Sequence, residues 1–181
     1  SGYSIVIIDT GINKTHPYFA GHIAYSYDFS GANDADATDF NGHGSNVSSI
    51  AAGSIGVAPG AGIIHLKVFA DNSGTALYTD VEEALQWVAA NAAAYNIASV
   101  NLSLGAGVNY NGATPHWLLG NEFQTLANLG VVAVASAGNS YYSYQAQGVS
   151  DIGADPNVLA VGAVYDGNVG GFSYGDGAVA Y

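Results

Sequence analysis

The sequence contains no cysteine and almost no basic residues. Without cysteine there can be no disulfide, no thiol nucleophile and no cysteine-based metal site. Lys and Arg together number 2 against 14 Asp and Glu, which gives a formal net charge of −12. So acidic a chain argues against nucleic acid and anionic membranes as partners, and the simplest role of the charge is solubility.

Long hydrophobic runs are also absent. No run approaches the roughly 18 apolar residues that a membrane-spanning helix needs. The first residues lack a charged segment followed by an apolar one, so we expect that any signal peptide has been removed or never existed. No repeat or low-complexity linker interrupts the 181 residues, of which 49% are hydrophobic and 25 are Gly. These features predict one tightly packed domain over residues 1–181.

Apolar runs alternate with helical patterns along the chain. Continuous apolar segments, typical of parallel strands that are covered on both faces, occur at residues 5–8, 63–69, 99–104, 131–135 and 158–164. Helices are predicted over 45–52, from Thr79-Asp80 onward, and over 116–129, with Gly130 as the cap of the last one. This order predicts an α/β fold with a three-layer, doubly wound, mostly parallel sheet. Ligands of such sheets bind beyond the carboxyl ends of the strands.

Asp9 ends the first apolar run and precedes Thr10-Gly11. A lone Asp in this place usually forms a turn or caps a helix. Asp-Thr-Gly also occurs in aspartic proteases, whose chemistry needs two carboxylates that share a proton. A second such motif is absent, since Asp151-Ile-Gly and Asp176-Gly are poor substitutes, and a homodimer would have to supply it.

His43 lies between two glycines just before the first predicted helix. The other four histidines are interpreted as structural or solvated. Gly42 and Gly44 allow the backbone to approach other groups closely, so the imidazole of His43 is a candidate general base. A carboxylate such as that of Asp9 could hold it in one tautomer.

Asn139 follows the apolar run 131–135 and the dipeptide Ala137-Gly138. Asn in a turn often only tolerates a left-handed backbone. Its side-chain amide could also donate to a developing oxyanion, a contribution of about 3–4 kcal/mol where such a donor has been removed.

Together these segments resemble the subtilisin-like serine peptidases. The segment 7–12 around Asp9 and the segment 42–53 around His43 are similar to the Asp and His regions of that family, and Ala137-Gly138-Asn139 is similar to its oxyanion region. The resemblance extends to Gly56-Val57-Ala58-Pro59 and covers essentially the whole chain. It implies that Asp9 orients His43, that His43 is the general base, and that Asn139 donates to the oxyanion.

The same resemblance implies where a peptide binds. Ser103, Leu104 and Gly105 are similar to the family's edge that pairs with extended substrate, and Ser73, Gly74 and Thr75 to the opposing strand. Ala137 and Gly138 are similar to the floor of the primary specificity pocket. The implied substrate is a polypeptide, and no organic cofactor is required.

The sequence departs from the family pattern at its most important point. The family's nucleophile lies in Gly-Thr-Ser-type sequence, and no Gly-Thr-Ser occurs here. Gly171-Phe-Ser173-Tyr-Gly175 fits a nucleophile elbow, but that motif needs a helix after it and Asp and His later in the chain. We therefore expect a C-terminally incomplete peptidase domain that is inactive by itself and is completed by a C-terminal fragment of the same protein.

Smaller departures lie behind the proposed base. Asn46 replaces the second His of the family pattern, and Ser48-Ser49 replace Ala-Gly. These changes are expected to alter packing rather than chemistry.

A structural calcium ion is a further expectation. Asp34, Asp36 and Asp39 form a local acidic cluster of hard oxygen donors, which suit calcium. Their spacing matches no EF-hand loop, and a solvated acidic loop is the competing interpretation.

The alternative from another functional class is a non-catalytic, truncated subtilase that binds peptides or a partner chain. An extracellular location is expected in either case.

Overall fold

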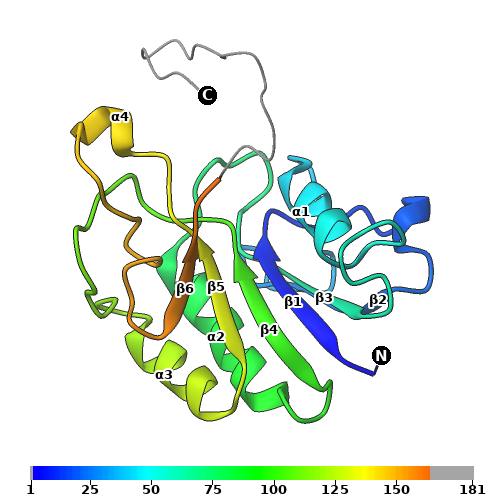
Figure 1. The fold of residues 1–181 in the computed structure, drawn as a ribbon. Helices are drawn as coiled ribbons and strands as arrows, with labels where there is room; N and C mark the ends of the chain where they lie inside the picture. The colour runs from blue at the N-terminus through cyan, green and yellow to red at the C-terminus, as the bar shows by residue number, and fades with distance from the viewer. Residues whose placement is uncertain (1, 164–181) are drawn as a thin grey trace.

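The fold is built on one six-stranded parallel sheet. The computed structural model describes residues 2–163 of the chain. Every neighbouring pair of strands is parallel, and their order across the sheet is β2-β3-β1-β4-β5-β6. The strands are β1 (Ser4–Asp9), β2 (Ile23–Asp28), β3 (Gly62–Lys67), β4 (Ile97–Leu102), β5 (Val132–Ser136) and β6 (Val158–Val161). Their arrowheads point to one edge of the sheet (Figure 1).

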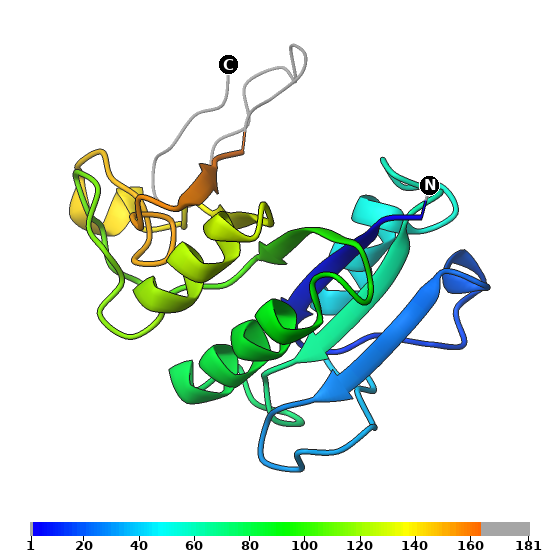
Figure 2. The same ribbon diagram turned by 90° about the horizontal axis from the view of Figure 1, so that it is seen from below.

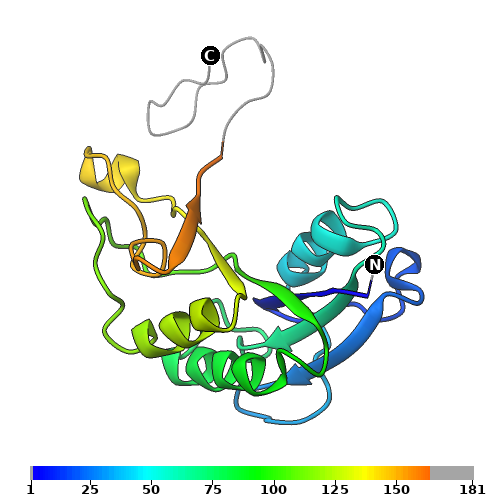
Figure 3. The same ribbon diagram turned by 60° about the horizontal axis from the view of Figure 1, so that its bottom comes forward.

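Helices lie on both faces of this sheet. Helix α1 (His43–Ala52) contacts β1 and β3 on one face, and α2 (Tyr78–Asn91) and α3 (Gly120–Asn128) pack together on the other (Figures 2 and 3). A 3₁₀ turn, η1 (Pro17–Phe19), and a short helix, α4 (Tyr141–Tyr144), lie in connections. The predicted three-layer, doubly wound α/β architecture is confirmed. Because the strand order reverses at β1, the edge beyond β1 and β4 is where such folds bind ligands.

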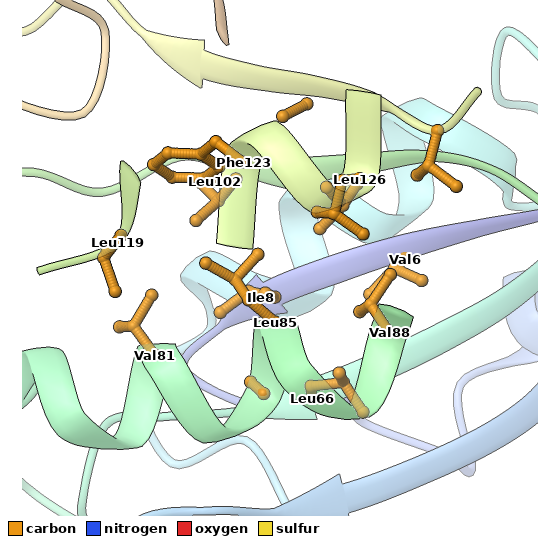
Figure 4. Packing of buried hydrophobic residues seen from close by; sticks show 14 of the residues in the cluster. Val6, Ile8, Leu66, Val81, Leu85, Val88, Leu102, Leu119, Phe123 and Leu126 are labelled. Atoms are coloured by element: carbon orange, nitrogen blue, oxygen red, sulfur yellow. The ribbon is translucent and has the colours of Figure 1, made fainter. Parts of the chain in front are cut away.

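The main core lies between the sheet and helices α2 and α3. One face of each central strand meets one face of each helix, as Val6, Leu85, Leu102 and Phe123 show in Figure 4. All four side chains are fully buried. Helix α1 closes a smaller core that includes Ile12, Phe19, Ala52 and Ile63. The sheet is therefore held rigidly beneath the loops at its carboxyl edge.

Several predicted boundaries were wrong. Strand β2 was not predicted, because its Tyr-rich sequence lacks a continuous apolar run. Helix α1 begins at His43 rather than Ser45, and α3 begins at Gly120 rather than His116. Residues 73–75 form an irregular segment rather than a strand, with one isolated bridge between Phe69 and Ala76.

Part of the sheet face that carries α1 is apolar and open. Val132, Leu159 and Val161 are 52%, 59% and 50% exposed. Ala133 and Val158 are paired in the sheet and face the main core. Because side chains alternate between the two faces of a strand, Val132, Leu159 and Val161 point to the opposite face. None of the helices among residues 2–163 is both long and apolar enough to cross a membrane.

Candidate active site

Asp9 and His43 form a hydrogen-bonded pair at the carboxyl edge of the sheet. The Nδ1 atom of His43 lies 2.7 Å from Oδ1 of Asp9. The Asp9 side chain is almost completely buried, whereas 48% of the His43 side chain is exposed. A carboxylate at Nδ1 favours the tautomer that carries its proton there, which leaves Nε2 as a base facing solvent.

The environment of Asp9 is unusual for an ionised carboxylate. Burial raises the pKa of Asp9, and the hydrogen bonds from His43 and from the Thr10 backbone N–H offset this effect only in part. The other oxygen, Oδ2, is buried and has no hydrogen-bond partner among the described residues. A buried carboxylate oxygen without a partner lowers the stability of the fold. Groups that lower stability in this way are typical of functional sites.

Close backbone contacts fix His43 in front of Asp9. His43 is the first residue of α1, and the preceding Gly42 has a φ of 96°, a conformation that favours glycine. A Cβ added to Gly44 would lie 2.3 Å from the Gly11 carbonyl oxygen, so only glycine fits there. The Gly44 N–H donates to Thr10 Oγ1 at 2.9 Å, which ties the helix directly to the loop after β1.

Asp39 supports the start of the same helix. Its carboxylate accepts hydrogen bonds from Ser45 N–H and Oγ, from the Gly42 and Asn41 N–H groups, and from Thr10 Oγ1. Burial opposes its ionisation, but the hydrogen bonds from Ser45, Gly42 and Asn41 outweigh burial and lower the pKa of Asp39 to about 2. A carboxylate at a helix N-terminus also satisfies free N–H groups and the helix dipole.

A second histidine lies behind the pair, where the sequence alone had indicated only a structural residue. His65 on β3 is fully buried; its Nε2 accepts from the Gly11 N–H at 3.1 Å, and its Nδ1 lies 3.0 Å from Ser48 Oγ. Burial lowers the pKa of His65 to about 3, so the ring is neutral, with its proton on Nδ1 facing Ser48. Ser48, one of the departures from the family pattern, is thus the partner of His65.

The two predicted peptide-binding segments lie side by side. A cavity of about 220 Å³ is lined by residues from both of them and from the start of α2. Its lining residues are Phe69, Gly74, Thr75, Ala76, Tyr78, Val81, Leu104, Gly105 and Ala106. Ser73 lines a neighbouring cavity instead, and Ser103 accepts a hydrogen bond from Asn101 Nδ2. We call this 220 Å³ cavity, with its two flanking segments, the groove.

The third predicted segment follows β5. Gly138 has a φ of 91°, and Asn139 is exposed and makes no side-chain hydrogen bond to another described residue. Because β1 and β5 flank β4, their ends are separated by two strand spacings, or about 10 Å. Added Cβ atoms on Gly105 and on Gly138 would each lie 3.2 Å from Cβ of Ser150, so Ser150 packs against both the predicted substrate edge at Gly105 and the predicted pocket floor at Gly138.

The predicted metal ligands do not converge. Asp34 and Asp36 bind the backbone of their own loop, and Asp39 binds the start of α1. Within the described part of the chain, no three Asp, Glu, His or Cys side chains come together as a metal site. These three residues therefore do not fit a calcium ion in this arrangement.

Ser173 lies outside the described residues.

The sequence of this chain is similar to those of known proteins. The model of the subtilase family matches residues 1–179 of the chain. The chain belongs to the subtilase family. Over 77% of its length it is 37% identical to alkaline serine exoprotease A of Vibrio alginolyticus, of which it covers 24%. It is 33% identical to thermitase of Thermoactinomyces vulgaris over 87% of its length, covering 57% of that protein.

Solved subtilase structures share the fold. An S41 psychrophilic protease is 29% identical, with a TM-score of 0.76 over 92% of this chain and 55% of that one. A cold-adapted subtilisin-like serine proteinase is 35% identical, with a TM-score of 0.62 over 77% of this chain and 47% of that one. This subtilase chain thus spans between 24% and 57% of the four proteins named above.

Proposed function

We propose that this chain supplies the acid–base pair and the peptide groove of a serine endopeptidase. The observation that carries the proposal is the 2.7 Å hydrogen bond between buried Asp9 and exposed His43 in a member of the subtilase family. The nucleophile of the complete protein is a serine contributed from outside the segments described above.

His43, Asp9 and Asn139 have separate roles in the proposed reaction. Nε2 of His43 accepts the serine proton as the hydroxyl oxygen attacks the peptide carbonyl, and Asp9 holds the ring and stabilises the imidazolium. The Asn139 side-chain amide donates to the oxyanion that forms. His43 then returns the proton to the leaving amine. No organic cofactor takes part in these steps.

The substrate is proposed to be an extended polypeptide. Backbone at Ser73–Thr75 on one side and at Ser103–Gly105 on the other would pair with it as an added strand, the mode called β-augmentation. The groove supports this role, because Gly74, Thr75, Leu104 and Gly105 line it together. Its apolar lining would accept a hydrophobic side chain.

We further propose that the segment that carries the serine covers the open sheet face of Val132, Leu159 and Val161. Each of these residues is at least half exposed, and covering apolar surface of this kind is favourable. An extracellular location is proposed with the peptidase role.

The test uses the complete protein and its His43→Ala variant. We expect kcat/KM for peptide hydrolysis to fall by at least about 10³-fold in the variant. His22→Ala is the control, because His22 precedes β2 at the opposite edge of the sheet. A fluorophosphonate, which reacts with an activated serine, is expected to label the complete protein and not residues 1–181 alone. Full activity in His43→Ala, or a complete protein that binds peptides without cleaving them, would support the non-catalytic alternative.

A further inference from the structure

A second carboxylate, that of Asp151, joins three segments that lie far apart in the sequence. Its Oδ1 accepts from the Ala106 N–H at 3.0 Å. Its Oδ2 accepts from the Tyr78 hydroxyl and faces Nε2 of His116 at 3.4 Å. We call Asp151 with Ala106, Tyr78 and His116 the Asp151 hub.

The direction of each hydrogen bond in the hub is fixed. Nδ1 of His116 accepts from the Leu118 and Leu119 N–H groups, so this nitrogen is unprotonated and Nε2 carries the proton toward Asp151. Tyr78 has only its hydroxyl to donate, and Ala106 its backbone N–H. The carboxylate is therefore a common acceptor for these three donors.

The hub favours an ionised carboxylate, with Asp151 and His116 buried, Tyr78 half-buried and Ala106 exposed. The His116 side chain is completely inaccessible, and that of Asp151 is 10% exposed. Burial opposes ionisation, but the hydrogen bonds from His116, Tyr78 and Ala106 outweigh it and lower the pKa of Asp151 to about 2. Burial and the neighbouring Asp151 carboxylate raise the pKa of Tyr78, so its hydroxyl stays protonated and remains a donor.

Two of the three donors belong to opposite walls of the groove. Tyr78 begins α2 and lines the groove on the side of residues 74–76, and Ala106 lines it on the side of residues 104–106. Ser150, the neighbour of Asp151, packs against both Gly105 and Gly138. Asp151 therefore links the two walls from beneath, and its own side chain does not line the groove.

From this arrangement we propose that Asp151 is a positioning residue for peptide binding, which holds the two walls of the groove at the separation that an extended chain needs. The inference rests on the proposed peptide-binding role. Charge-assisted hydrogen bonds are strong and directional. An ionised carboxylate can therefore hold the two walls at this separation better than a neutral side chain can. Asp151→Asn keeps the shape but places an N–H₂ donor in a site that presents only donors.

Asp155 offers a matched control in the same turn. It is also buried and also binds the segment around His116, through the His116 N–H at 2.8 Å, but it contacts neither groove wall. Asp155→Asn is the control variant, because it weakens this part of the fold without changing a contact to either groove wall. Tyr78→Phe removes one donor while it keeps the ring that lines the groove.

The experiment measures binding of two dye-labelled peptides by fluorescence anisotropy to the complete protein carrying His43→Ala, which prevents cleavage and serves as the parent chain. One is the hexapeptide Ala-Leu-Ala-Ala-Phe-Ala, long enough to contact both walls, and the other is the dipeptide Phe-Ala. For the hexapeptide we expect Kd to rise about tenfold in Asp151→Asn, about threefold in Tyr78→Phe and less than twofold in Asp155→Asn. For the dipeptide, all variants should stay within twofold of the parent chain.

The outcomes separate the two proposals. If the parent chain does not bind the hexapeptide, the proposed function is contradicted and the inference with it. If the parent chain binds and folded Asp151→Asn binds equally well, or if Asp155→Asn loses as much affinity, the inference alone is wrong. Should Asp151→Asn fail to fold, Tyr78→Phe decides: unchanged hexapeptide affinity in that variant overturns the proposal.

Discussion

Two Asp–His pairs lie within the described residues, and they differ in which nitrogen faces the carboxylate and in how far solvent reaches the ring. Asp9 lies 2.7 Å from Nδ1 of a His43 that is 48% exposed. Asp151 lies 3.4 Å from Nε2 of a His116 that is fully buried and whose other nitrogen is occupied by backbone N–H groups. Only the first pair leaves a ring nitrogen free to move a proton.

The carboxylates differ in the same sense. Asp9 has a raised pKa and one unpartnered buried oxygen, so its charge costs stability. Asp151 has a pKa of about 2 and partners on both oxygens, so its charge stabilises the fold. An Asp–His pair therefore indicates catalysis only where the histidine is partly exposed and where polar atoms of the pair remain without a hydrogen-bond partner.

The largest expected difference between the two pairs is in catalysis. In the complete protein, Asp9→Asn should lower kcat by about 10⁴-fold, because the ring of His43 loses the group that fixes its tautomer. Asp151→Asn should lower kcat by no more than about tenfold, since Asp151 does not touch the reacting atoms. Steady-state kinetics on both variants measures these changes. Equal losses of kcat would contradict the conclusion that the Asp9 pair is catalytic and the Asp151 pair structural.

The second difference is in stability, and it has the opposite order. Asp151→Ala should lower the free energy of unfolding by about 2–4 kcal/mol at pH 7, because the buried His116 and two less buried donors, Tyr78 and Ala106, lose their acceptor. Asp9→Asn should leave the free energy unchanged or raise it, because a carboxyl group with a raised pKa contributes stability in acid and loses it as the pH rises through that pKa. Urea unfolding of residues 1–181 measures both, and a stability loss in Asp9→Asn equal to that in Asp151→Ala would contradict the comparison.

The smallest effect concerns His65, which lies behind the first pair. Its folded pKa of about 3 lies below the value of 6.5 expected in the unfolded chain, so its contribution to stability is fully present above pH 6.5 and is lost as the pH falls toward 3. Between pH 7.5 and 4.5 this contribution should fall by about 2–3 kcal/mol.

The variant His65→Gln isolates that contribution, because Gln can accept from Gly11 and donate to Ser48 but does not titrate. Its free energy of unfolding should depend less on pH than that of the parent chain over the same interval. Identical pH dependence in the two proteins would show that His65 does not remain neutral in acid.

The fold class and the candidate Asp–His pair could both be predicted from residue patterns along the chain. Continuous apolar runs marked β1, β3, β4, β5 and β6, because strands that are covered on both faces need apolar residues at every position. Asp9 and His43 stood out because of their place after a strand and between glycines, and family resemblance linked them. Strand β2 was missed because its tyrosines pack at a half-buried edge of the sheet and give no apolar run.

The contacts of the other polar residues could not be predicted in this way, because they depend on how distant segments pack. Asp151 was interpreted as a poor copy of the Asp9 motif, and His65 and His116 as structural or solvated, because the sequence does not show which side chains meet. Folding brings Tyr78, Ala106 and His116 to one carboxylate across 73, 45 and 35 residues of sequence. The pattern of side chains along a chain sets local structure, but the balance of burial and hydrogen bonding that makes one Asp–His pair reactive and the other structural exists only once distant segments have packed together.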